Sequence, residues 1–168
     1  MTLIEVLLAL AISTAMFIAI SAAFKASAEA VTINDSFSRC TQTTRIAMGQ
    51  MIAELRRADA VKVDPAGAFV DVIRPIDQLT PNEISRRYAY DAKAKRLTLQ
   101  ILYAGNYLSP QYELAKNLTT CQFGPAEMGV DATKAAVVLR VPMALTCSIG
   151  YSTFTLHGSA APRRAQKY

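Results

Sequence analysis

The chain opens with a long apolar run. Residues 1–24 carry one charged side chain, Glu5, and the next charge is Lys25. A helix of this length is about 36 Å long, which exceeds the roughly 30 Å hydrocarbon core of a bilayer. Residues 1–25 are therefore predicted to form a hydrophobic transmembrane helix. A generic membrane anchor would have the same length, but a secretory signal would begin with basic residues and have a shorter apolar segment.

After Lys25 the apolar positions recur on one side of the expected helix. They lie three or four residues apart, and most charged side chains fall between them. The apolar set consists of Ile33, Phe37, Cys40, Thr44, Ala47, Met48, Met51 and Leu55. Since the first proline is Pro65, nothing before it forces a break. We predict one helix over residues 2–58, and we expect the amphipathic part, within residues 26–60, to pack on a domain.

Residues 61–168 are predicted to form one β-rich domain. Strands are expected at residues 69–73, 84–90, 96–103, 135–141 and 149–157, with a hairpin turn at 91–95. Pro142 is expected to end the fourth strand. The weakly periodic stretch 104–133 is expected to be a long loop with one or two helical turns at 112–118. The predicted fold class is α+β, with the second half of the long helix packed on an antiparallel sheet of four or five strands.

Glu5 stands out because an ionised side chain inside a bilayer costs about 2.5–3.5 kcal/mol or more and usually faces a partner. The amine of Met1 on the same helix is poorly placed, because the carboxylate lies a full turn further along the axis. The amine of a neighbouring copy is better placed. The sequence around Glu5, from Thr2 to Leu10, reads Thr-Leu-Ile-Glu-Val-Leu-Leu-Ala-Leu. It resembles the start of a mature type IV pilin or type II secretion pseudopilin.

This resemblance implies a life cycle as well as a fold. Such proteins are first held in the bacterial inner membrane, where a prepilin peptidase cuts and N-methylates them. An assembly platform then polymerises them into an extracellular filament that is used in adhesion and motility. Here the processed residue would be Met1, where the family usually has Phe. The expected partners are copies of the same chain, with Glu5 pairing with the Met1 amine of a neighbour. Type IVa pilins carry helix breakers near positions 14 and 22, which are Thr14 and Ala22 here.

Basic residues in two parts of the chain favour two other roles for the protein. The helix end, residues 45–58, closes on Leu-Arg-Arg-Ala and is similar to J-type pseudopilins and W-type minor pilins. That similarity favours a minor pilin or a secretion pseudopilin. The net charge of +5, with Arg163, Arg164 and Lys167 near the C-terminus, favours a membrane-anchored module that binds DNA or a surface.

Three cysteines in a domain expected outside the cytoplasm indicate one disulfide and one free thiol. Cys121 and Cys147 both lie in the C-terminal third, beside short polar residues, and we predict that they pair. This bridge would resemble the C-terminal disulfide loop of many type IV pilins. Cys40 is then expected to be a free, buried residue on the helix.

No catalytic constellation is visible in the sequence. It has a single histidine, His157, and lacks the cysteine spacing of a zinc site, a phosphate-binding loop and a nucleophile elbow. Glu127 and Asp131 supply too few oxygens for calcium, which takes six to eight. We therefore predict a structural protein without enzymatic activity, cofactor or metal.

Overall fold

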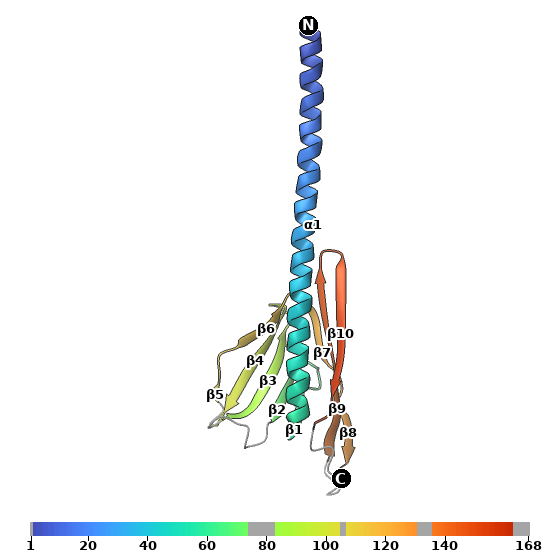
Figure 1. Cartoon of the computed structure of the whole chain (residues 1–168). Helices are drawn as coiled ribbons and strands as arrows, with labels where there is room; N and C mark the ends of the chain where they lie inside the picture. Colours follow the sequence, from blue (N-terminus) through green and yellow to red (C-terminus); the bar gives the residue numbers. More distant parts are fainter. Residues whose placement is uncertain (1, 74–82, 105–106, 131–135, 163–168) are drawn as a thin grey trace. The chain divides into compact units, whose positions relative to one another are not determined.

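The computed structural model describes residues 2–73, 83–104, 107–130 and 136–162. The chain divides into two units, Met1–Ser36 and Phe37–Tyr168. Helix α1, Leu3–Arg57, belongs to both (Figure 1). The predicted helix over residues 2–58 is confirmed to within a residue at each end. Arg56 and Arg57 lie in its last turn, where positive charge complements the negative end of the helix dipole.

The first sheet has six antiparallel strands. They are β1 (Ala60–Val63), β2 (Phe69–Ile73), β3 (Glu83–Asp91), β4 (Arg96–Tyr103), β5 (Tyr107–Leu108) and β6 (Tyr112–Lys116). Strands β1 to β5 follow one another in sequence order, and β6 also pairs with β4. The turn between β3 and β4 is held by Asp91, whose Oδ1 accepts hydrogen bonds from the N–H groups of Lys93 and Ala94, both at 3.0 Å. The N–H of Ala94, and then that of Lys93, lower the pKa of the Asp91 carboxyl.

The second sheet has four antiparallel strands. They are β7 (Leu118–Phe123), β8 (Glu127–Val130), β9 (Ala136–Ile149) and β10 (Ser152–Ala160). The long strand β9 pairs with β10 along one side, and with both β7 and β8 along the other. Gly150, with φ of 60°, and the exposed Tyr151 form the turn between β9 and β10. The second sheet is thus built around β9.

The α+β class is confirmed, but two sheets replace the single sheet of four or five strands. The stretch expected to be a long loop contains β5, β6, β7 and β8, and the helical turn expected at 112–118 is wrong because Tyr112–Lys116 is a strand. Part of this stretch, residues 105–106 and 131–133, lies outside the described residues. Three of these strands pair through shifted registers: β6 with β4 between Leu97 and Thr98, β7 with β9 between Leu118 and Thr120, and β8 with β9 between Glu127 and Met128. Such irregular strands show little period-2 alternation in the sequence.

The prediction that Pro142 ends a strand is also wrong, because Pro142 lies inside β9. Its carbonyl accepts a hydrogen bond from the N–H of Gly124 at 2.8 Å, just beyond the end of β7. In an antiparallel strand the N–H and C=O of one residue point to the same side. The missing N–H of Pro142 therefore faces Gly124, between the end of β7 and the start of β8, where it removes only the return hydrogen bond of that pair. The strand expected at 149–157 instead begins after the turn, at Ser152.

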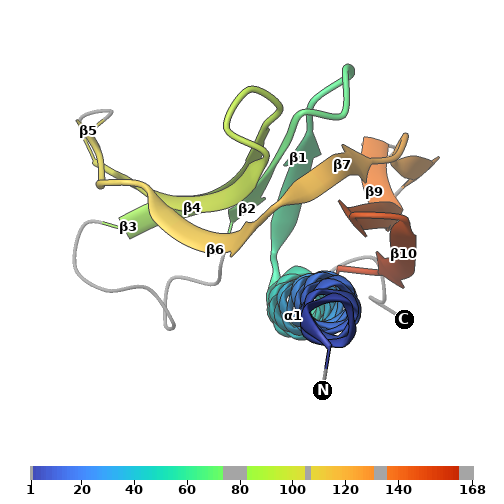
Figure 2. The same ribbon diagram turned by 90° about the horizontal axis from the view of Figure 1, so that it is seen from above.

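The core lies where α1 meets the two sheets. Figure 2 looks along α1 and shows β3, β4 and β6 on one side of the helix and β9 and β10 on the other. The buried side chains of α1 all come from its second half and are Cys40, Thr44, Ala47, Met48, Met51 and Leu55. On β10, Gly158 lets the helix approach closely, since a Cβ there would lie 2.8 Å from Met48 Sδ and 3.1 Å from Ile52 Cδ1.

Candidate assembly helix and helix–sheet bridge

Glu5 closes the N-terminal end of its own helix. Its Oε2 accepts a hydrogen bond from the backbone N–H of Thr2 at 2.7 Å, and its own N–H donates to the carbonyl of Thr2 at 3.0 Å. This is the Glu half of a capping box, in which the acid at the third helical position bonds back to the N-cap residue. Within a single chain, Glu5 therefore already has a hydrogen-bond partner. Met1, its predicted partner in a neighbouring copy, lies outside the described residues.

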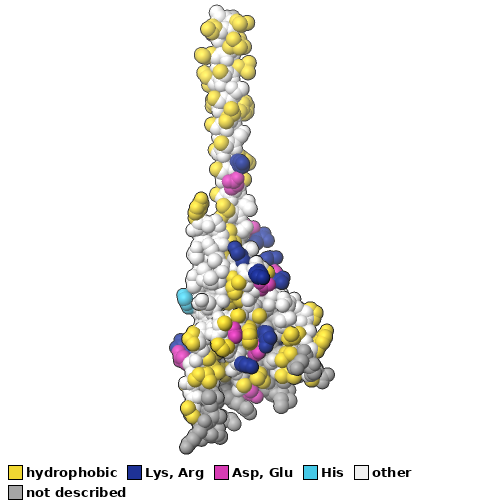
Figure 3. Space-filling model, turned by 180° about the vertical axis from the view of Figure 1, so that it is seen from behind, with side chains coloured by type: hydrophobic (Ala, Val, Ile, Leu, Met, Phe, Trp, Pro, Cys, Tyr) yellow, Lys and Arg dark blue, Asp and Glu magenta, His cyan; other side chains and the backbone are white. Residues whose placement is uncertain are grey.

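The first unit leaves its apolar side chains exposed. An 18-residue window of α1 near the N-terminus has a mean hydropathy of 2.5 with none of it buried, so by length and composition the helix is sufficient to cross a membrane. Leu3, Phe17 and Phe24 are between 69% and 82% exposed. Figure 3 shows hydrophobic side chains along the stem, which we define as residues 3–36 of α1. Burying such a surface requires lipid or another protein, because the stem supplies no partner for it.

The stem helix is continuous at the two positions where type IVa pilins carry helix breakers. Ser13 and Thr14 donate their hydroxyl hydrogens to the carbonyls of Ala9 and Ala11, at 2.8 and 2.9 Å. Such back-bonding bends or loosens a helix only slightly. Ala22, at the other position, lies inside the same uninterrupted helix. In this single chain the helix is unbroken from residue 13 to residue 22.

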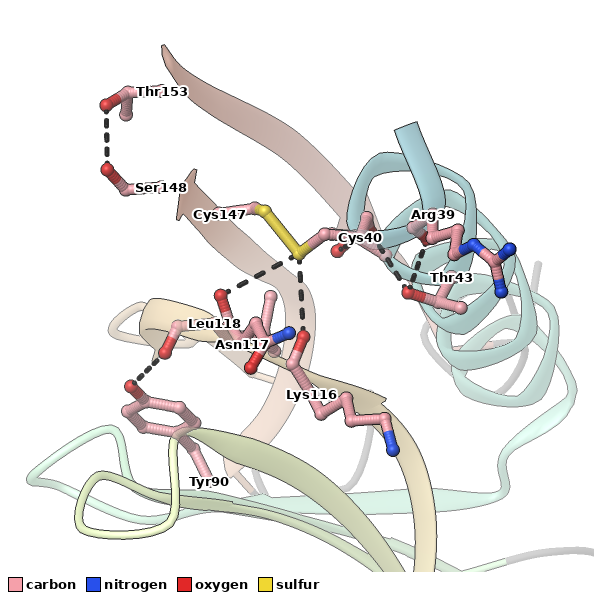
Figure 4. The surroundings of a disulfide bond; sticks show 11 residues. Arg39, Cys40, Thr43, Tyr90, Lys116, Asn117, Leu118, Cys147, Ser148 and Thr153 are labelled. Carbon is pink, nitrogen blue, oxygen red and sulfur yellow. Dashed lines mark hydrogen bonds between the residues drawn. A yellow bond between two sulfur atoms is a disulfide. The ribbon is translucent and has the colours of Figure 1, made fainter. Parts of the chain in front are cut away.

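The disulfide joins the helix to the second sheet. It links Cys40 on α1 to Cys147 on β9, with their Cα atoms 6.6 Å apart (Figure 4). The predicted Cys121–Cys147 pair is therefore wrong in one partner, and Cys40 is not free. Cys121 is the unpaired thiol.

Strand register explains why Cys121 does not pair with Cys147. Cys121 on β7 lies opposite Leu145, whereas Cys147 lies opposite Leu118. The two cysteines are thus diagonal neighbours on one face, for which Cα atoms are typically about 7–8 Å apart, beyond the usual range for a disulfide. Cys121 is 5% exposed, and its burial raises the pKa of the thiol to about 12. This thiol is therefore almost entirely protonated at neutral pH, and the protonated form is the unreactive one.

A strand corner lies beside the bridge. One residue, Asn117, separates β6 of the first sheet from β7 of the second, and its φ of 60° turns the chain between them. The Tyr90 hydroxyl on β3 lies 2.9 Å from the carbonyls of both Leu118 and Thr119 and donates its hydrogen there. Cys40 Sγ lies 3.5 and 3.7 Å from the carbonyls of Lys116 and Asn117. A bridged sulfur has no hydrogen to donate, so these are close contacts.

One charged pair joins the far end of the helix to the first sheet, and a second pair lies within that sheet. Arg86 on β3 contacts Glu54 of α1 at 2.6 Å and Glu83 at 2.7 Å. The neighbouring Arg87 forms a two-point pair with Asp71 on β2, at 2.7 and 2.8 Å. Bidentate arginine–carboxylate pairs are directional as well as attractive, so they fix orientation. These contacts leave no periodic pattern in the sequence, because the residues that form them lie far apart along the chain.

The other residues singled out in the sequence do not gather into a site. His157 is exposed on β10, and Glu127 lies 3.8 Å from Arg140, while Asp131 lies outside the described residues. Within the described part of the chain, no group of three or more His, Cys, Asp or Glu side chains is placed to hold a metal. Arg163, Arg164 and Lys167, the proposed nucleic-acid contacts, also lie outside the described residues.

A shallow groove of about 390 Å³ runs beside β1 and β8. Its walls are mostly apolar and include Val61, Val63, Met128 and Val138. Lys62 and Asp64 are its charged members. This lining supplies hydrophobic contact but no cluster of reactive groups.

Comparison of the chain with protein-family models, curated proteins and solved structures finds no match. The class that the structure defines is an α+β protein with a long, apolar N-terminal helix packed on antiparallel sheet, an arrangement compatible with a pilin-like fold.

Proposed function

We propose that this protein is a structural subunit of a type IV pilus or pilus-like filament, polymerising through the stem. The proposal is carried by one observation: an 18-residue stretch of the stem is strongly apolar with none of it buried, and the run before Lys25 contains a single charge, Glu5, in the first helical turn. An apolar helix of this kind has to be buried in lipid or against other helices. The stem therefore spans the inner membrane first and enters the core of the filament later.

Close packing accounts for the attraction between stems. Moving a helix from lipid to a helix bundle exchanges one apolar environment for another, so van der Waals contact and lipid release have to drive the transfer. Ala9, Ala11, Ala15 and Ala19 allow helices to approach closely. These small side chains favour assembly without requiring any catalytic step.

Glu5 supplies the register between neighbouring stems. Its Oε2 accepts a hydrogen bond from the Thr2 N–H within one chain, and a carboxylate accepts more than one hydrogen bond. The Met1 amine of a neighbour adds the opposite charge, and low dielectric strengthens that attraction while raising the cost of removing both charges from water. The pair therefore specifies position more than it adds stability.

A second candidate is a minor pilin or secretion pseudopilin, favoured by Arg56 and Arg57, which lie exposed at the end of α1. The two roles differ in stoichiometry. Filaments are sheared from cells, imaged by electron microscopy, and analysed by quantitative mass spectrometry, including the N-terminal peptide. Long filaments made mainly of this chain support the shaft role, and traces within filaments of another chain support the minor role. If the chain occurs only in membranes and never in filaments, the proposal is wrong, and the membrane-anchored DNA- or surface-binding module takes its place.

A further inference from the structure

The disulfide sits at the point where α1 first becomes buried. Along the described part of the helix, Cys40 is the first buried residue, with 4% of its surface exposed. The buried residues that follow, such as Thr44 and Met48, all lie on its C-terminal side. The covalent link therefore stands at the N-terminal edge of the contact between helix and sheets.

The other end of the link is held on both sides. Cys147 is fully buried in β9, where it lies opposite Phe154 of β10 and Leu118 of β7. The carbonyls of Lys116 and Asn117 lie against Cys40 Sγ (Figure 4). A pull on Cys40 is thus transmitted into a strand with hydrogen-bonded neighbours on either side.

We propose that the Cys40–Cys147 bridge is a tension latch, which carries a pull on the N-terminal helix directly into β9. The bridge spans a sequence separation of 107, so residues 41–146 lie inside the covalent loop and outside the path of the force. That loop contains the second half of α1, the whole first sheet, β7, β8 and residues 136–146 of β9, so the force enters β9 at Cys147, near its C-terminal end. The inference rests on the proposed filament role only for the natural source of the tension.

Without the bridge, the same pull would load the helix contacts one turn at a time. The first to be loaded would be those at Cys40 and Thr44, and the last would be those at Leu55 and the Glu54–Arg86 pair. Each turn contributes a few side-chain contacts, and breaking the contacts of one turn at a time needs a lower force than breaking all of them together. A covalent bond at Cys40, in the first buried turn, prevents this stepwise detachment of the helix from starting.

Single-molecule pulling on the full chain in detergent, with handles at its two ends, tests the latch. The bridged protein is Cys121→Ala, which removes the buried thiol but leaves the bridge, and the unbridged protein is Cys40→Ala combined with Cys121→Ala. The expected final extension of the bridged protein is about 370 Å shorter, because residues 41–146 are not extended. The unbridged protein should also show an early rupture that releases residues 41–57, at a lower force than the first rupture of the bridged protein.

Two outcomes would overturn the proposal. The first is a final extension of the Cys121→Ala protein that equals the length of the whole extended chain. This result is measured on one protein alone, so it holds even if the double variant does not fold. The second is an equal first-rupture force in the two proteins, which would show that the helix contacts resist the pull without the bridge. Filament formation plays no part in either measurement, so a failure of the proposed function leaves this test intact.

Discussion

The two halves of α1 share one backbone and differ in what their side chains meet. In the stem, residues 3–36, the apolar side chains remain exposed, whereas the half from Phe37 to Arg57 buries Cys40, Met51 and Leu55 against the sheets. The fact that a segment is helical therefore does not show that it contributes to the free energy of unfolding of the single chain. The second half stabilises the folded chain through its own contacts, while the stem depends on surroundings that a single chain does not supply.

The largest expected effect comes from the one charge at the start of the stem. Glu5→Ala and Glu5→Gln are both expected to abolish filaments while leaving the thermal unfolding of the second unit unchanged. Glutamine retains a side-chain oxygen that accepts the Thr2 hydrogen bond, but it lacks the negative charge needed by the neighbouring amine. Electron microscopy of sheared material measures the effect. Normal filaments from Glu5→Gln would show that assembly needs the cap and not the charge.

A matched pair of methionines compares the halves directly. Met51 is fully buried and Met16 is 60% exposed, and both lie on α1. Met51→Ala is expected to lower the free energy of unfolding by about 2–5 kcal/mol, because it leaves a cavity between helix and sheets. Met16→Ala is expected to change it by less than about 0.5 kcal/mol. Denaturant unfolding of the full chain in detergent provides the measurement, and equal losses at the two positions would contradict the division.

The same comparison applies to two glutamates of the helix. Glu54 pairs with Arg86, and Glu29 is exposed on the stem. Glu54→Ala is expected to cost roughly 1–3 kcal/mol, since it removes a hydrogen bond between charged groups that are largely shielded from water. Glu29→Ala serves as the control and should leave unfolding nearly unchanged. Unfolding in urea at two salt concentrations is informative, because a largely buried pair should respond weakly to salt. A stable Glu54→Ala protein would assign the fastening of this helix end to apolar contacts alone.

The smallest expected effect is a gain in the free energy of unfolding. Gly49 lies in the second half of α1, and a Cβ added there meets no atom within 4 Å. Gly49→Ala should therefore raise the free energy of unfolding by about 0.5–1 kcal/mol, as alanine loses less backbone entropy in a helix. Gly158→Ala on β10 is the contrasting variant, since its Cβ would meet Met48 Sδ and it should destabilise instead. Thermal unfolding followed by circular dichroism separates the two signs.

The sequence predicted the elements whose pattern is local. The length of α1 followed from apolar spacing and the absence of proline, and β2 and β4 appeared at the expected residues, 69–73 and 96–103. The capping of Glu5 was also readable, because Thr2 and Glu5 have the spacing of a capping box.

What the sequence did not reveal depends on contacts between distant residues. The strands between residues 104 and 133 are short, and several of their pairings shift register, so they carry little periodic signal. The cysteine pairing was wrong because proximity along the chain does not reveal that Cys40 faces β9 while Cys121 lies diagonal to Cys147. The prediction for Pro142 was wrong because a proline is tolerated inside β9 only at the point where β7 ends, and the sequence does not show that point.

The order of the three cysteines has a consequence for biosynthesis. Because a ribosome makes the chain from its N-terminus, Cys40 and Cys121 both exist before Cys147, the partner that Cys40 finally takes. An oxidant acting early would join the first two, and only thiol–disulfide exchange could then restore the native pair. Strand β9 therefore has to emerge before the native bridge can close, and wherever an oxidant has first joined Cys40 to Cys121, a disulfide isomerase is expected to raise the yield of the native bridge.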